Sequence, residues 1–126
     1  MKILLSVAIG GAVGATARYL LGSQIGTWLA AGSPWITLMV NILGSFVLGV
    51  FVTLSAFVWS PSVPLRAFIV VGVLGGFTTF SAFSLDVVLL AERGRLETAV
   101  LYALASLFLA VGALFAGLRL TRWILA

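Results

Sequence analysis

The side chains that could do chemistry are concentrated in residues 72–84, which read GVLGGFTTFSAFS. This stretch holds three glycines and four hydroxyl residues, and phenylalanine recurs in it at positions 77, 80 and 83. Glycines and hydroxyls together favour backbone that leaves the helix, which hydrocarbon tolerates only where protein surrounds the irregularity. Aromatic rings at a fixed spacing beside such backbone are typical of a lined site. The stretch therefore predicts a broken helix next to a polar site.

The composition around this stretch excludes several classes of protein. Of the 126 residues, 63% are hydrophobic and 8% are charged, which indicates an integral membrane protein. The sequence has no cysteine and no histidine, so a disulfide framework is excluded and neither a zinc site nor thiol or imidazole catalysis is expected. The acidic residues are Asp86, Glu92 and Glu97. We expect no enzyme, and the net charge of +4 suits contact with a lipid bilayer and not with nucleic acid.

Four apolar runs predict a single four-helix transmembrane domain over residues 1–126. The expected spans are residues 3–28, 35–59, 65–90 and 98–118. The third span contains the polar stretch, and Gly75 beside Gly76 is the expected point of its break. Arg18 and Tyr19 follow the first apolar run directly, which favours a retained first span over a cleaved signal peptide.

Polar residues also lie within the second and fourth spans. Thr37, Asn41 and Ser45 are four residues apart and share one helical face. A buried asparagine needs hydrogen-bond partners, so this stripe predicts either contacts between helices or the lining of a pore. Tyr102 and Ser106 share a face of the fourth span, where packing is favoured over pore lining.

The basic residues indicate how the chain inserts. Arg18, within the first span, predicts either an interfacial contact or a positive charge in an aqueous vestibule that attracts anions. The four spans place Lys2, Arg66, Arg119 and Arg122 on one side of the membrane, against Arg93 and Arg95 on the other. This bias is weak, so the chain is expected to insert in either orientation and to pair as an antiparallel homodimer.

Three segments resemble the bacterial Fluc/CrcB family of fluoride channels. They are GGFTTFSAFS at 75–84, VNILGSFVLG at 40–49 and GGAVGATARY at 10–19. The first motif is highly specific, whereas the other two are weak alone. The resemblance covers three of the four expected helices, and the length and four-span layout agree with it.

The resemblance implies an all-α membrane protein with a broken third helix, which forms an antiparallel, dual-topology homodimer with two pores. It also implies a channel in the inner membrane that passively exports fluoride from the cytoplasm and so lowers fluoride toxicity. A structural sodium ion at the dimer centre would be held by the backbone carbonyls of Gly75 and Thr78. The expected lining of the fluoride pore is Asn41, Phe80, Phe83, Tyr102 and Ser106, with the hydroxyl residues Thr37, Thr79, Ser81 and Ser84.

The chemistry of these residues suits such a pore. Fluoride is small and strongly hydrated, so a pore must replace its water with neutral amide and hydroxyl donors and with the positive edges of aromatic rings. Carbonyl oxygens freed by a helix break suit a hard cation such as sodium. Two positions depart from the family pattern, since Ala82 stands where a hydroxyl residue is usual and Asp86 stands where glutamate is common.

The main alternative is a small four-span proton-coupled multidrug transporter. That mechanism needs a carboxylate within the membrane to exchange protons for a cationic substrate. The first, second and fourth spans contain none, and Asp86 lies near the end of the third. A structural subunit whose polar residues serve packing is a third interpretation.

Overall fold

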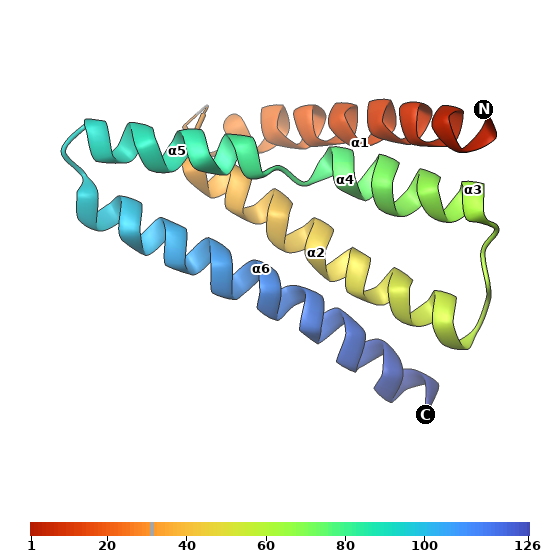
Figure 1. Cartoon of the computed structure of the whole chain (residues 1–126). Helices are drawn as coiled ribbons and strands as arrows, with labels where there is room; N and C mark the ends of the chain where they lie inside the picture. The colour runs from red at the N-terminus through yellow and green to blue at the C-terminus, as the bar shows by residue number, and fades with distance from the viewer. Residues whose placement is uncertain (31) are drawn as a thin grey trace.

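The chain folds into long helices joined by short connections (Figure 1). The computed structural model describes residues 1–30 and 32–126, and these residues contain no β-strand. The helices are α1 (Lys2–Gly26), α2 (Pro34–Phe57), α3 (Val63–Arg66), η1 (Ala67–Leu74), α4 (Gly75–Phe77), α5 (Phe80–Glu92) and α6 (Leu96–Leu125). Four helical segments are long and apolar enough to cross a membrane: α1, α2, the run from α3 to α5, and α6.

The boundaries of these helices follow from local sequence. Proline occupies the first turn of both α2 and α3, where its missing N–H has no partner to lose. Gly94 has a φ of 73°, a left-handed conformation that glycine adopts without strain, and it turns the chain between α5 and α6. The predicted fourth span ended at Leu118, whereas α6 continues as a helix to Leu125.

The third span is interrupted, but not at the predicted residues. Gly75 is helical, with φ −65° and ψ −36°, so the expectation of a break at Gly75 and Gly76 was wrong. The extended residues are Thr78, with ψ 157°, and Thr79, with φ −150° and ψ 127°. Before the break, η1 is a π-helix, in which the Gly75 N–H reaches back to the carbonyl of Val70.

Glycines explain how closely the third span approaches α1. A Cβ built on Gly10 would collide with the carbonyl oxygen of Phe68, and one on Gly72 would lie 2.7 Å from the Cα of Gly10. A Cβ built on Gly76 would lie 2.8 Å from the carbonyl oxygen of Gly11. The two backbones therefore touch, as small residues allow where helices meet in a membrane.

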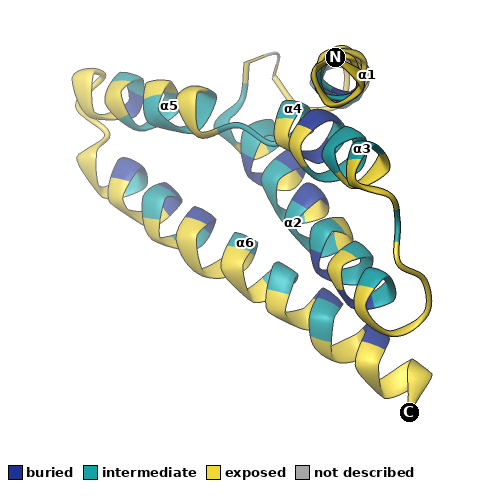
Figure 2. Cartoon of the chain, turned by 45° about the vertical axis from the view of Figure 1, so that its right-hand side comes forward, coloured by how far each residue is buried: buried dark blue, intermediate teal, exposed yellow. Residues whose placement is uncertain are grey.

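Helices α2 and α6 form a second closely packed pair. Glycines again allow the two backbones to approach closely. A Cβ on Gly49 would collide with the carbonyl of Leu114, and one on Gly117 would collide with that of Phe46. The buried cluster is small and lies where α2, α5 and α6 meet; it consists of Leu38, Leu90, Ala99 and Tyr102, with Ile42, Phe83 and Val87 packed against it. Figure 2 shows buried positions confined to the facing sides of the helices. Exposed apolar side chains cover the rest, as expected where lipid is the solvent.

Candidate functional site

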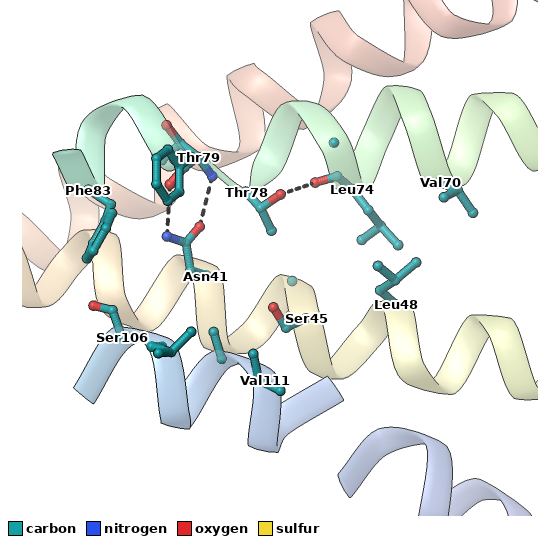
Figure 3. A pocket seen from close by; sticks show the side chains of 15 residues that line it. Asn41, Ser45, Leu48, Val70, Leu74, Thr78, Thr79, Phe83, Ser106 and Val111 are labelled. Atoms are coloured by element: carbon teal, nitrogen blue, oxygen red, sulfur yellow. Dashed lines mark hydrogen bonds between the residues drawn. The ribbon is translucent and has the colours of Figure 1, made fainter. Parts of the chain in front are cut away.

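The break in the third span is held by one side chain of α2. The Asn41 Nδ2 donates to the carbonyl oxygen of Thr79 at 2.9 Å, and the Thr79 N–H donates to the Asn41 Oδ1 at 2.8 Å (Figure 3). The amide side chain thus satisfies both backbone groups of a residue that has left the helix. Asn41 therefore links α2 to the third span, which is the contact between helices that was one of the two interpretations of the polar stripe. It retains a second Nδ2 proton, because a primary amide has two donors.

Most hydroxyls of the motif are bonded to nearby backbone. Thr78 Oγ1 donates to the carbonyl of Leu74 at 2.9 Å, and Ser84 Oγ donates to the carbonyl of Phe80 at 2.9 Å. The Thr79 Oγ1 accepts from the Ala82 N–H at 3.2 Å, which makes Thr79 the N-cap of α5. These bonds give the hydroxyls a structural role at the break.

A cavity of about 480 Å³ lies beside the break, between α2, the third span and α6. Of the predicted site residues, it is lined by Asn41, Gly75, Thr78, Thr79, Phe80, Phe83 and Ser106. Ser45, from the polar stripe, also lines it, and none of its lining residues is ionisable. The Ser106 Oγ is buried and has no hydrogen-bond partner among the described residues. A buried hydroxyl without a partner is costly, so this donor is available to a bound molecule or ion.

Aromatic rings extend from this cavity towards α2. Phe80 and Phe83 have ring centroids 5.3 Å apart, and Phe83 lies 5.5 Å from Tyr102. Tyr102 in turn meets Trp35 edge to face at 6.1 Å. The Phe80 side chain is 78% exposed, whereas Tyr102 is 1% exposed. The row therefore runs from the surface of the chain into its buried cluster.

A second, wider groove of about 910 Å³ lies between the C-terminal half of α1, the start of α2 and α5. It is lined by the predicted residues Arg18, Thr37 and Ser81, and by Asp86. Thr79 lines both this groove and the smaller cavity. Arg18 is half-buried within α1 and lines this groove, and its role there stays a prediction.

The predicted pore residues are therefore divided between these two spaces. Ser84 and Tyr102 line neither of them. The Tyr102 hydroxyl donates to the Asp86 Oδ2 at 3.0 Å, a partnership that was not predicted. Its signal lies in the spacing, since Asp86 follows Phe83 by three residues and so shares the helical face that meets Tyr102.

Gly44 is a second residue that was not predicted as part of the site. It lines the smaller cavity, and a Cβ built on it would collide with the Thr78 Cγ2 and lie 3.1 Å from the Phe77 ring. A side chain at position 44 would therefore force the side chains of Thr78 and Phe77 to move.

The resemblance implies that backbone carbonyls of Gly75 and Thr78 hold a sodium ion. Carbonyl oxygens are suitable ligands for such a hard cation, but one copy of the chain offers too few of them. The backbone carbonyls of Gly75 and Thr78 accept none of the hydrogen bonds formed by the described residues. Free carbonyl oxygens at a helix break are the ligands found for Na⁺ in discontinuous helices. Two oxygens are fewer than the roughly six that hard cations take, so a single copy of the chain leaves the set incomplete.

Several known proteins are similar to this chain. Residues 5–118 match the family model described as CrcB-like protein, Camphor Resistance (CrcB). A Rhodospirillum centenum protein named fluoride-specific ion channel FluC is 58% identical over 122 residues, which cover 97% of each chain. Proteins of the same name from Agrobacterium fabrum, 52% identical over 92% of this chain and 93% of the relative, and from Nitrobacter winogradskyi, 49% identical over 94% of each, are also similar.

Proposed function

The chain belongs to the CrcB-like family, and on this premise we propose that it is a channel for fluoride. It is a multi-pass membrane protein and not an enzyme. Relatives that carry the name fluoride-specific ion channel match it over nearly their whole length.

The observation that carries this proposal is the neutral lining of the smaller cavity. Its donors are the second Nδ2 proton of Asn41 and the unpartnered hydroxyl of Ser106, and the rings of Phe80 and Phe83 line the same cavity. Such groups replace the water of a strongly hydrated anion one hydrogen bond at a time. Conduction requires weak sites in series, and a fixed positive charge in the cavity would instead hold the ion.

Transport by this pore is passive and, when cytoplasmic fluoride exceeds external fluoride, outward. A proton-coupled transporter would require a titrating carboxylate in the substrate path. In the third span, Val63–Glu92, Asp86 lies in the C-terminal part, and its carboxylate is bonded to Tyr102 outside the smaller cavity. The channel would lower fluoride toxicity from the inner membrane, where export from the cytoplasm takes place.

The functional unit that we propose is an antiparallel homodimer of inverted copies. Phe80 and Gly75 line the cavity yet are exposed in one copy, so a second copy is needed to close the pore around them. The weak bias of basic residues allows the two orientations that an inverted pair requires. Two copies would also double the free carbonyls of Gly75 and Thr78. A structural sodium ion held there would tie the two breaks together.

Fluoride efflux from liposomes tests the channel directly. Purified protein is reconstituted into liposomes loaded with fluoride, and a fluoride electrode records release after an ionophore clamps the potential. We expect rapid passive efflux that empty liposomes lack. Protein that is monodisperse but releases no fluoride above that background would refute the proposal. Proton-driven uptake of a cationic dye would establish the transporter instead.

Two further measurements test the antiparallel dimer and the structural sodium ion separately. Because the chain has no cysteine, Ala126→Cys gives a single thiol, which an impermeant maleimide should label to about half in sealed vesicles if both orientations are present. Labelling near zero or near completion would exclude dual topology. Rigorous removal of sodium should abolish efflux, and undiminished flux from an intact dimer would exclude a structural role for the ion.

A further inference from the structure

The net charge of the chain resides entirely at one end of the molecule. Lys2, Arg66, Arg119 and Arg122 form this basic end, which contains no acidic residue. The three remaining arginines are matched in number by the three acidic residues, so the net charge of +4 belongs to the basic end. Figure 1 shows the N-terminus, α3 and the C-terminus at the same end, opposite the connection between α5 and α6.

Two of these cations are positioned by aromatic rings. The Arg119 guanidinium lies 5.0 Å from the ring centroid of Phe115, and the Arg122 guanidinium lies 6.0 Å from that of Phe57. Both arginines are exposed, and the described residues form no ion pair with either. A cation–π contact orients a guanidinium without neutralising it. Both forks of N–H donors therefore remain available to an anion.

Tryptophans at the same end locate this pair at the depth of lipid headgroups. Trp123, next to Arg122 in α6, is 78% exposed, and Trp59 after α2 is 49% exposed and packs edge to face on Phe51 at 6.4 Å. Exposed tryptophans at the ends of membrane spans are typical of the interface between hydrocarbon and water. Figure 2 shows the last turns of α6 as largely exposed surface.

We propose that Arg119 and Arg122 bind the phosphate of an anionic phospholipid of the surrounding bilayer. Planar guanidinium groups match phosphate oxygens two at a time, and the rings of Phe57 and Phe115 offer contact to the upper acyl chain. The absence of acidic residues from this end favours an anionic over a zwitterionic headgroup. This site is separate from the ion path, so it does not depend on which ion the channel conducts.

Quenching of tryptophan fluorescence by brominated lipids tests this site. In a Trp28→Phe and Trp35→Phe background, emission comes from Trp59 and Trp123, which both lie at the basic end. Brominated phosphatidylglycerol or brominated phosphatidylcholine is titrated into phosphatidylcholine bilayers at constant salt. We expect half-maximal quenching at an about thirtyfold lower fraction of the anionic lipid, because each of the two arginines contributes about 1 kcal/mol near an anionic surface.

The matched variants are R119Q/R122Q and R93Q/R95Q, which each remove two exposed arginines from opposite ends of the molecule. The preference for phosphatidylglycerol should vanish in R119Q/R122Q and persist in R93Q/R95Q. Native mass spectrometry of the chain with all its tryptophans should show the same loss of retained phosphatidylglycerol. Equal quenching by both lipids, or equal loss in both variants, would overturn the site. Displacement by soluble glycerol phosphate would show that it takes free phosphate and not lipid.

Discussion

The two halves of the third span are held in opposite ways on either side of Thr78 and Thr79. Before this point, η1 and α4 lie backbone to backbone on α1, and glycines such as Gly14 leave no side chain between them. After it, α5 packs on α6 through large side chains, with the ring of Phe83 5.5 Å from that of Tyr102. At the break itself, Asn41 of α2 forms hydrogen bonds with the backbone of Thr79, which lies between the two halves.

This difference indicates what each half can tolerate. A contact between two backbones cannot relax by rotating a side chain, so the distance between α1 and η1 is fixed. A contact between rings, supported by the hydrogen bond from Tyr102 to Asp86, can adjust by rotamer and by small shifts of the helix. We infer that the first half is a rigid platform and that the second half, which carries Phe80 and Phe83, is the adjustable wall of the cavity.

The largest effect is expected from Gly14→Ala on the rigid side. The new Cβ would collide with the carbonyl oxygen of Val73 and lie 2.8 Å from the backbone nitrogen of Phe77. Neither atom can move without displacing the helix, so we expect a loss of about 3 kcal/mol in the free energy of unfolding. Denaturation of the purified protein, followed by its tryptophan emission, measures this loss.

Gly11→Ala is the matched control for this substitution. It lies on the same helix, but a Cβ there meets nothing within 4 Å. We expect unchanged or slightly increased stability, because alanine has the higher helix propensity by about 1 kcal/mol. If Gly14→Ala were as stable as Gly11→Ala, the two backbones would not be in contact and the platform would not exist.

The next largest effect should come from Asn41→Asp at the junction. A carboxylate can still accept from the Thr79 N–H, but it cannot donate to the Thr79 carbonyl, and it places a negative charge on the lining of the cavity. Fluoride efflux should fall at least about tenfold, since a nearby like charge costs more than 1 kcal/mol in a partly desolvated path. Gln24→Glu, the same change at an exposed position of α1, is the control. Wild-type flux at a pH where the introduced aspartate is ionised would remove Asn41 from the ion path.

The sequence predicted the helices and the presence of a break better than its position. Apolar runs and turn residues are local signals, so four helical spans could be read from them. The glycines at 75 and 76 were interpreted as the break because glycine favours irregular backbone. Gly76 instead allows α1 to approach, which is a contact between distant segments and leaves no local signal. Two threonines with an asparagine partner from α2 form the break.

Several residues that line the cavity and the groove could be singled out from the sequence, but their division between the two spaces could not be predicted. Spacing along α2 places Thr37 and Asn41 on one face, yet Thr37 lines the groove and Asn41 the cavity. The boundary between the two spaces is Thr79, whose position depends on the break. Tertiary packing also decides which hydroxyls are hydrogen-bonded to backbone and which have no partner. The Ser84 hydroxyl is bonded to backbone, whereas the Ser106 hydroxyl has no partner among the described residues.

A smaller effect is expected from Tyr102→Phe on the adjustable side. The substitution keeps the rings packed against Phe83 but removes the hydrogen bond to Asp86. We expect a loss of about 1.5 kcal/mol in the free energy of unfolding, as for a bond to a charged acceptor. Tyr19→Phe, at a side chain that is 74% exposed, should change little. In the double variant with Asp86→Ala, which removes the acceptor, the two losses should not add, and additive losses would show that the bond contributes nothing.

The smallest effect, Thr79→Ala, tests whether the two halves are independent. It removes the N-cap of α5, which costs about 1 kcal/mol, whereas Thr79→Ser keeps an accepting hydroxyl for the Ala82 N–H. If the platform is rigid, amide hydrogen exchange in Thr79→Ala should quicken in the first turn of α5 and stay unchanged in η1, and Thr79→Ser should match the parent in both. Faster exchange in η1 as well would mean that the break transmits strain back to the contact with α1. The two halves of the third span would then respond to the substitution as one element. In that case the first half would not be a rigid platform that is independent of the adjustable second half.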